Sequence, residues 1–385
     1  KPLNIGSEAS LNILDSIGKS QKIEIISNGI VLIKIHFTWD YGNAISDVSI
    51  KSGNPKKINP KILDEQKIKS ESGKLELFLN TRIVNQLFPD LLKFLPKLQI
   101  ATLLATTRLV GTRCPGMFSL YSGFSLSFID SSFSDNLKFK VIKYDNRFKL
   151  VKIQIKGPSS TGVIRSFIRP RQVKQSDYNS IAKNVNKHEF QDQSALIIGG
   201  TRGLGEVTAK LLAAGSADVK LSYYKGEKDA IRIVDDINLN GGCASFFQHN
   251  VLSPNEKVIE NILNNWQPTH LYYFATPFIF SATRGKFSNS IYKLFCDYYI
   301  TGFNHIMDIL ISYGLKNAYY PSSIAIDEKP SDMQEYISAK LEGEALCTKF
   351  ENIHNSMKIY KPRLPRIETD QTVSLFPVIN QDPVA

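Results

Sequence analysis

The chain has 385 residues, 42% hydrophobic and 22% charged, which excludes a disordered tail and allows two domains. Its net charge is +11, and this charge is unevenly placed. Residues 1–190 hold 29 of the 47 lysines and arginines, whereas residues 191–385 carry a slight excess of acidic residues. A basic first half predicts an acidic partner, and charge alone does not choose among nucleic acid, membrane and protein.

The first half contains mainly β-type runs, at residues 23–37, 124–129, 137–144 and 148–157, and one helical stretch at 91–110. This order predicts a curled antiparallel sheet with a helix. The helical stretch contains Lys93, Lys97 and Arg108, so no membrane span is expected. Secretion is not indicated either, because the first residues lack a charged-then-apolar leader.

A polar stretch at residues 171–193 separates this half from a region of alternating strand and helix signals. We therefore predict a first domain at 1–172, a linker at 173–192 and a second domain at 193–385. Four cysteines lie far apart with no Cys-x-x-Cys pair, so neither a metal site nor a disulfide framework is predicted, and a reducing, cytoplasmic location is favoured.

The second domain opens with an apolar run at 194–198 that leads into a glycine turn. Gly199, Gly203 and Gly205 stand at GxxxGxG spacing in front of an amphipathic segment. Glycine lets the turn reverse sharply, lets a pyrophosphate approach the backbone and lets the helix pack on the strand. In this context the pattern favours a phosphate site over a merely structural turn.

A second motif consists of Ser323, Tyr336 and Lys340, with thirteen residues from serine to tyrosine and four from tyrosine to lysine. Residues four apart share one face of a helix. An ammonium group beside a phenol stabilises the phenolate, so we expect Lys340 to lower the pKa of Tyr336. Tyr336 would then pass a proton to a carbonyl oxygen held by Ser323. The alternative is that Tyr336 and Lys340 are ordinary surface residues.

Together, GGTRGLG, the serine at its thirteen-residue offset and YISAK resemble the short-chain dehydrogenase/reductase family over residues 191–375. The resemblance implies an α/β Rossmann-type doubly wound parallel sheet, a nicotinamide cofactor and hydride transfer at a carbonyl or alcohol carbon. It also implies that Lys340 contacts the nicotinamide ribose. The implied cofactor-binding residues are Gly199, Thr201, Arg202, Gly203, Leu204, Gly205, Tyr224, Lys225, Asn250, Val251, Ala275 and Thr369.

The sequence also bears on the choice of cofactor. An acidic residue after the second strand would bind both ribose hydroxyls and repel a 2′-phosphate. Here that position reads LSYYKG at 221–226, with no acid and with Lys225 nearby, and Arg202 adds a second cation. These residues favour NADP over NAD, although Lys225 also fits as a residue that simply solvates the turn.

Four positions depart from the family pattern. FATP at 274–277 keeps Ala275 but lacks the usual glycine, and Tyr299 stands where a helix-borne asparagine commonly completes a proton relay. Asn250 replaces an aspartate, and Arg366 replaces the glycine of the family's PGxxxT loop. Cofactor binding is therefore better supported than efficient turnover.

In the first domain, residues 87–128 combine a helical apolar face, a turn with Gly111, Pro115 and Gly116, and a strand. This order resembles the hotdog fold of acyl-thioester dehydratases, including the MaoC-like group, over residues 75–170. Residues 1–74 are a candidate second, degenerate hotdog. Dehydration needs a histidine base and a carboxylic acid. His36 with Asp40 is one candidate pair, although an isolated strand histidine is more often structural, and Asp90 fits equally as an N-cap.

These features lead to one main expectation: an NADP-dependent ketone reductase, acting on a β-ketoacyl thioester, whose hotdog-like domain binds or dehydrates the acyl group. An acidic acyl carrier protein would explain the basic first half. Dispersed cations without stacking aromatics argue against nucleic acid. The alternatives are a nucleotide-binding interaction protein without turnover, and a reductase of a free sugar or metabolite with the first domain as scaffold. A homodimer is compatible with either.

Overall fold

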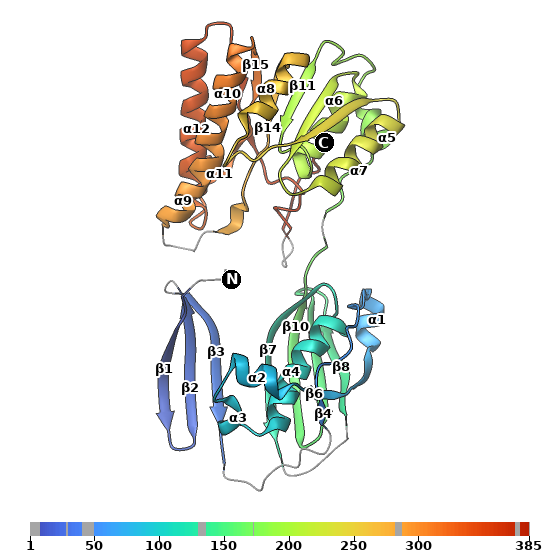
Figure 1. Ribbon diagram of the computed structural model, residues 1–385, viewed down its shortest axis with the longest axis vertical. Helices are drawn as coiled ribbons and strands as arrows, with labels where there is room; N and C mark the ends of the chain where they lie inside the picture. The colour runs from blue at the N-terminus through green and yellow to red at the C-terminus, as the bar shows by residue number, and fades with distance from the viewer. Residues whose placement is uncertain are drawn as a thin grey trace. The chain divides into compact units, whose positions relative to one another are not determined.

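The computed structural model describes residues 8–27, 30–40, 50–129, 136–171, 173–281, 287–373 and 378–384. The chain divides into two compact units, Lys1–Arg169 and Pro170–Ala385 (Figure 1). The division lies close to the predicted end of the first domain at residue 172. Among the described residues, no helix combines the length and apolarity needed to cross a membrane.

An antiparallel sheet of five strands dominates the first unit, in the order β5-β8-β9-β10-β7. Buried and exposed side chains alternate along its strands, so that in β8 Leu137, Phe139 and Val141 are buried while Lys138 and Lys140 are exposed. The buried side packs on α4 (Lys97–Thr112). The strands are β5 (Ser72–Leu75), β7 (Ser119–Phe128), β8 (Leu137–Asp145), β9 (Leu150–Gly157) and β10 (Ser160–Ile168).

Short elements connect to this sheet. The described residues include a parallel two-stranded pairing of β4 with β6, and three short helices precede α4 along the chain. Their bounds are β4 (Ile50–Ser52), α1 (Glu65–Ser70), β6 (Leu77–Leu79), α2 (Thr81–Leu87) and α3 (Leu91–Phe94). The predicted helical stretch at 91–110 is thus split in two, because Pro96 lacks the backbone N–H that a continuous helix needs.

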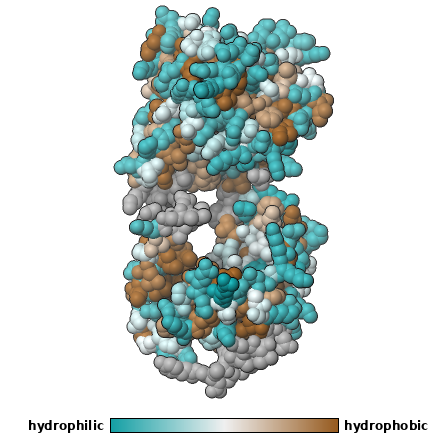
Figure 2. All heavy atoms as spheres, viewed as in Figure 1, coloured by the Kyte–Doolittle hydropathy of each residue, from teal (hydrophilic) through white to brown (hydrophobic). Residues whose placement is uncertain are grey.

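A separate three-stranded antiparallel sheet, β1-β2-β3, is amphipathic. The register places Leu11 opposite Ile25 and Ile25 opposite Ile33, so one face is apolar, and Leu11 keeps 60% of its surface exposed. Figure 2 shows hydrophobic side chains gathered over these strands. The strands are β1 (Ser10–Ile17), β2 (Ser20–Ser27) and β3 (Ile30–Thr38).

The second unit has a six-stranded, all-parallel sheet, in agreement with the parallel sheet that the sequence predicts, in the order β13-β12-β11-β14-β15-β17. The strand order reverses between β11 and β14, and the crevice at such a reversal, at the carboxyl ends of the strands, is where ligands bind in open α/β sheets. The strands are β11 (Ser194–Ile198), β12 (Asp218–Tyr223), β13 (Cys243–Gln248), β14 (His270–Tyr273), β15 (Asn317–Tyr319) and β17 (Lys358–Tyr360).

Helices cover both faces of this sheet (Figure 1). Ala195 and Ile197 of β11 pack with α6 and α7, whereas Leu196 and Ile198 pack with the helices of the opposite face. The helical elements are α6 (Gly203–Ala214), α7 (Glu227–Leu239), α8 (Glu256–Asn265), η2 (Ile279–Ser281), α9 (Asn289–Cys296), the π-helical η3 (Asp297–Thr301), α10 (Gly302–Ser312), α11 (Ala325–Glu328) and α12 (Gln334–Ile353). A short parallel pair, β16 (Ser322–Ser323) and β18 (Arg363–Leu364), extends the strand ends.

The predicted linker at 173–192 differs in the structure. It includes α5 (Tyr178–Ile181) and η1 (Ala182–Asn184), and both Tyr178 and Ile181 are buried. The Tyr178 hydroxyl donates to the Ala213 carbonyl at 3.3 Å, and Lys210 Nζ donates to the Ser176 carbonyl at 2.9 Å. Two apolar side chains in a polar stretch are thus enough to attach it to the second unit.

Candidate active site

The glycine turn lies between β11 and α6, where each of its three predicted glycines meets a steric limit. Gly199 has φ +83° and Gly203 φ +52°, in the left-handed region that favours glycine. A Cβ on Gly205 would lie 2.3 Å from the Gly199 carbonyl oxygen. The turn therefore needs glycine at these positions, while Thr201, Arg202 and Leu204 supply its side chains.

Two distant segments close around this turn. A Cβ on Gly199 would lie 2.8 Å from the backbone nitrogen of Ala275, which follows β14, so the two strand ends meet at the reversal of strand order. A Cβ on Gly203 would lie 3.1 Å from Cγ2 of the buried Thr369. The structure thus brings Ala275 and Thr369 to the glycine turn, as the resemblance implies.

The residues expected around the adenosine are Arg202 of the glycine turn and the residues that follow β12 and β13. Arg202 Nε donates to Asp229 Oδ2 at 3.0 Å, and 55% of its side chain is exposed. Lys225 Nζ lies 5.1 Å from the centre of the exposed Tyr224 ring. After β13, Asn250 Oδ1 accepts from the Leu252 N–H at 3.1 Å. Val251 packs instead against Gly302, at the start of α10.

The Ser323 hydroxyl lies close enough to the buried Tyr336 to affect its pKa, and Ser323 Oγ accepts a hydrogen bond from the Ala325 N–H at 3.2 Å. Ser323 ends β16, beyond the carboxyl end of β15, and Tyr336 lies in the first turn of α12 with 8% of its surface exposed. Burial raises the pKa of Tyr336, and the nearby Ser323 hydroxyl opposes this shift. The expectation that Lys340 lowers this pKa is not met, because burial of the phenol dominates and the ammonium lies over the ring rather than at the hydroxyl.

Lys340 is enclosed by aromatic rings. Its Nζ donates to the Pro321 carbonyl at 2.7 Å and lies 3.9, 4.8 and 5.9 Å from the ring centres of Tyr299, Tyr320 and Tyr336. Burial lowers the pKa of Lys340 to about 7, while the more distant charges of Cys347 and Glu344 act in the opposite direction. The rings also favour the ammonium form, since a cation is attracted to the face of an aromatic ring.

Tyr299 connects the glycine turn to this lysine. It lies in the π-helical segment η3 between α9 and α10, a distortion often found at functional sites. Its hydroxyl is 2.5 Å from Thr276 Oγ1, next to Ala275, and its ring centre is 5.8 Å from that of Tyr336. A continuous set of contacts therefore runs from the turn to the phenol.

Sequence reasoning missed Tyr320 and Gly343. The Tyr320 hydroxyl donates to the Tyr299 carbonyl at 3.2 Å, and a Cβ on Gly343 would lie 1.9 Å from that hydroxyl. Gly343 therefore admits the Tyr320 ring against α12. A glycine inside a helix, three residues after Lys340, was the available signal.

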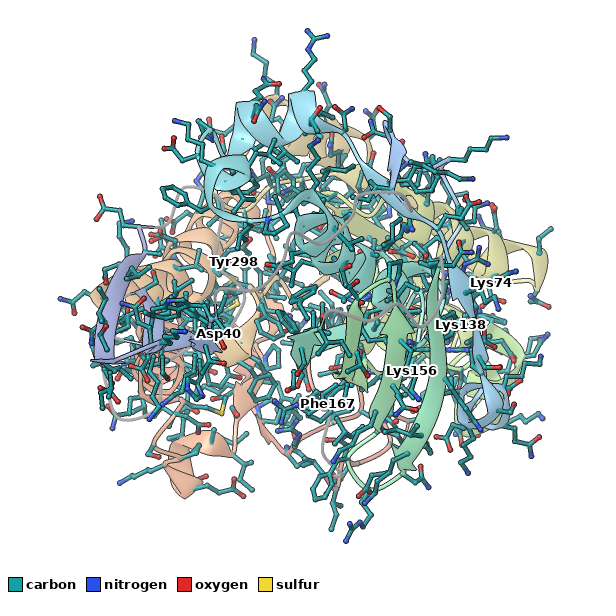
Figure 3. All side chains as sticks on the ribbon, turned by 90° about the horizontal axis from the view of Figure 1, so that it is seen from below. Asp40, Lys74, Lys138, Lys156, Phe167 and Tyr298 are labelled. Carbon is teal, nitrogen blue, oxygen red and sulfur yellow. The ribbon has the colours of Figure 1, made fainter. Side chains whose placement is uncertain are left out.

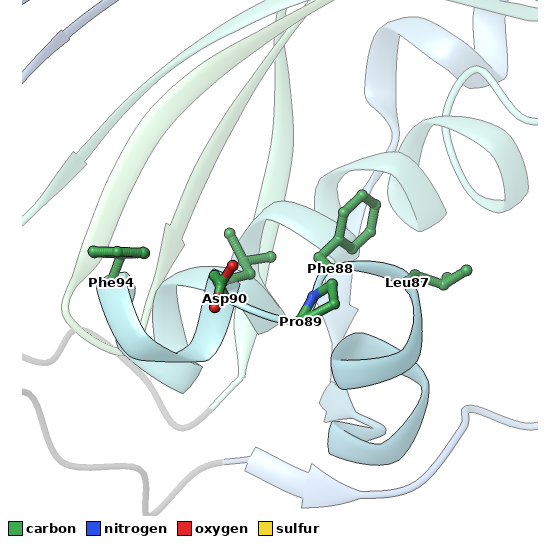
Figure 4. Close-up of a pocket in the computed structure, with 6 residues that line it drawn as sticks. Leu87, Phe88, Pro89, Asp90 and Phe94 are labelled. Atoms are coloured by element: carbon green, nitrogen blue, oxygen red, sulfur yellow. The ribbon is translucent and has the colours of Figure 1, made fainter.

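In the first unit, the candidate residues His36, Asp40 and Asp90 each interact with a different partner. Ser20 Oγ lies 3.0 Å from His36 Nε2, while Asp40 forms an ion pair with Lys19. Asp90 occupies the N-cap position of α3 but makes no capping hydrogen bond and instead accepts from Lys93 Nζ at 2.8 Å. It lines a shallow, mainly apolar hollow with Leu87, Phe88 and Phe94 (Figure 4).

No family model and no curated protein matches the chain. Solved structures do match at low identity. A short-chain dehydrogenase from Shigella flexneri complexed with NADP is 15% identical, covering 52% of this chain and 89% of its own, with a TM-score of 0.47. A short-chain dehydrogenase from Burkholderia cenocepacia in complex with NADP is 20% identical, covering 47% of this chain and 77% of its own, with a TM-score of 0.42. The angucycline C-6 ketoreductase LanV with bound NADP is 16% identical, covering 48% of this chain and 77% of its own, with a TM-score of 0.43.

Proposed function

We propose that the second unit is an NADP-dependent ketone reductase of the short-chain dehydrogenase type and that its substrate is a β-ketoacyl thioester. One observation carries the proposal: the Ser323 hydroxyl lies beside the buried phenol of Tyr336, with Lys340 one helical turn further along α12. A chain of contacts through Tyr299 and Thr276 links them to the glycine turn at the reversal of strand order.

The glycine turn fits a dinucleotide. A Cβ on Gly199 or Gly205 would collide with backbone atoms, and Gly203 has a left-handed φ of +52°, so glycine permits the tight turn that leads into α6, whose N-terminus suits a pyrophosphate. Arg202 and Lys225 supply cations suited to a 2′-phosphate. When bound, NADPH supplies the hydride that adds to the carbonyl carbon.

The buried groups account for the proton. Because the pKa of Tyr336 is raised, its phenol is protonated at neutral pH and can donate to the carbonyl oxygen as hydride reaches the carbon. Ser323 donates to the same oxygen and orients the ketone. The Lys340 ammonium is fixed by Pro321 and the tyrosine rings, and we assign it to the nicotinamide ribose, as the family resemblance implies.

For the first unit we propose a hotdog-like domain that binds the acyl thioester. Support comes from a five-stranded antiparallel sheet that packs on the sixteen-residue helix α4. In the hydrogen bonds described above, His36 pairs with Ser20 and Asp90 pairs with Lys93. Neither partner is the second acid–base group that dehydration needs. Binding rather than dehydration is therefore the proposed role.

The test is NADPH oxidation with a short β-ketoacyl thioester. We expect Tyr336→Phe to lower kcat by about 10²-fold or more, because it removes a general acid. Tyr360→Phe, a change at a tyrosine that is 69% exposed, is the matched control. Equal rates for wild type and Tyr336→Phe would refute the proposal.

A second candidate is nucleotide binding without turnover. It is favoured by the burial of Tyr336 and Lys340, which keep 8% and 5% of their surface. Calorimetry would then show NADPH binding to a protein that oxidises none with any of a panel of ketones. Turnover with even one ketone, lost in Tyr336→Phe, would exclude this candidate.

A further inference from the structure

The outer face of the five-stranded sheet in the first unit carries rows of basic side chains. Lys74 lies directly opposite Lys138, and Lys138 opposite Lys156 (Figure 3). A second row runs across the same face through Lys143, Lys152 and Arg165. Lys140 lies between the two rows on β8 and is also exposed.

Such rows oppose the stability of the sheet. Neighbouring strands are about 4.8 Å apart, and like charges directly opposite one another are destabilising. None of the ion pairs described for these strands joins Lys138, Lys140 or Lys152 to a carboxylate, whereas Lys143 lies close enough to Asp145 to help lower the pKa of that carboxyl. Asp145 lies at the end of β8 and is engaged by Arg147 at 2.9 Å. Lys138, Lys140 and Lys152 therefore carry positive charge that the ion pairs described for these strands do not offset.

The chemistry of the face favours a protein over other polyanions. The positions between the cations are Gln154, Thr161 and Val163, which offer no aromatic surface on which bases could stack. Lysine predominates, whereas the bidentate geometry suited to phosphate belongs to arginine. Carboxylates on an acidic protein surface match a flat array of ammonium groups by simple charge complementarity.

We propose that this sheet face docks an acidic protein that carries the acyl thioester, an inference that rests on the proposed reduction for the identity of the cargo. Docking on one unit raises the local concentration of the thioester at the other, since both belong to one chain. Electrostatic steering also speeds encounter, with an effect that weakens as salt rises.

The experiment measures binding of the full chain to a fluorescently labelled, acidic acyl carrier protein at low salt. Lys138→Glu with Lys140→Glu reverses two charges on the face, and the new carboxylate at 138 would lie opposite Lys74 and Lys156, which favours folding. Lys56→Glu with Lys57→Glu makes the same charge change at exposed loop residues of the same unit and is the matched control.

We expect the Lys138/Lys140 variant to weaken binding by about tenfold or more and the Lys56/Lys57 variant by less than about twofold. Equal weakening in both variants, or none in either, would overturn the proposal. So would tighter binding of wild type to a DNA duplex or to anionic vesicles than to the carrier. Reduction of a small, carrier-free thioester, measured in parallel, is expected to be the same in both variants, so failure of the reductase proposal is recognised separately.

Discussion

Two lysines in the second unit share a sequence pattern and differ in their surroundings. EVTAK in α6 and YISAK in α12 each place a lysine four residues after a partner, and both lysines are buried. Lys210 contacts two carboxylates, Glu206 at 3.0 Å and Asp236 at 2.9 Å. The contacts described for Lys340 Nζ are with three aromatic rings and one backbone carbonyl.

This difference separates a lysine that carboxylates neutralise from one whose pKa is lowered by burial. Carboxylates neutralise Lys210 and connect α6 to α7, where Arg232 also donates to Glu206 at 2.9 and 3.0 Å. Lys340 has no adjacent carboxylate in its cage, so burial can bring its pKa to about 7. Spacing puts a lysine on a helix face, and the neighbouring elements decide its chemistry.

The largest expected effect follows removal of the partner of Lys210. Glu206→Ala leaves the buried ammonium with Asp236 as its one described carboxylate partner, and we expect a loss of about 3–5 kcal/mol in the free energy of unfolding of the second unit. Denaturant unfolding, followed for that unit, measures it.

Glu206→Leu with Lys210→Met is the control for this experiment. Replacing a buried ion pair with apolar residues is often nearly neutral, so the double variant should recover most of the loss. A double variant as unstable as Glu206→Ala would mean that the helix packing, rather than an unpaired charge, is responsible.

The next effect concerns pH. The pKa of Lys340 falls from its ordinary value of 10.5 to about 7 in the folded protein, so between these values the unfolded chain binds more protons. The contribution of Lys340 therefore makes the folded state more stable as pH rises from about 7 to 10, by several kcal/mol at most.

Comparison with Lys340→Met isolates this contribution. Burial also raises the pKa values of Cys347, to about 12, and of Tyr336, which lowers stability at the upper end of this range, but both groups are present in both proteins and cancel in the difference. The difference in unfolding free energy between wild type and Lys340→Met should change with pH between 7 and 10. A difference that stays constant would show that Lys340 is not held in the cage.

A smaller effect tests the ring of Tyr299. Tyr299→Phe keeps the ring and loses the contact with Thr276, which should cost about 1 kcal/mol of stability. Tyr299→Leu removes the ring as well and should lose more stability than Tyr299→Phe. We expect this extra loss to be about 1 kcal/mol greater at pH 6, where Lys340 is charged, than at pH 9. An extra loss that does not change with pH would show that the ring contributes packing and no attraction to the ammonium.

The sequence predicts the parallel sheet and the glycine turn, because these depend on local order and on glycine geometry. It does not predict the cage around Lys340, because Tyr299, Tyr320 and Tyr336 come from three separate elements. It also misplaces residues 173–192, since their polar composition conceals the burial of Tyr178. Contacts between distant segments have no local signal in one sequence.

The smallest effect extends the comparison to the exposed lysines of the first unit. Lys138 lies between Lys74 and Lys156 on neighbouring strands, so Lys138→Glu turns two repulsive pairings into attractive ones. We expect the first unit to gain roughly 0.5 kcal/mol at low salt and less at high salt, because screening weakens exposed pairs. Lys138→Gln should give about half of this gain. A loss of stability in both variants would mean that the lysine stems, rather than their charges, determine packing on this face.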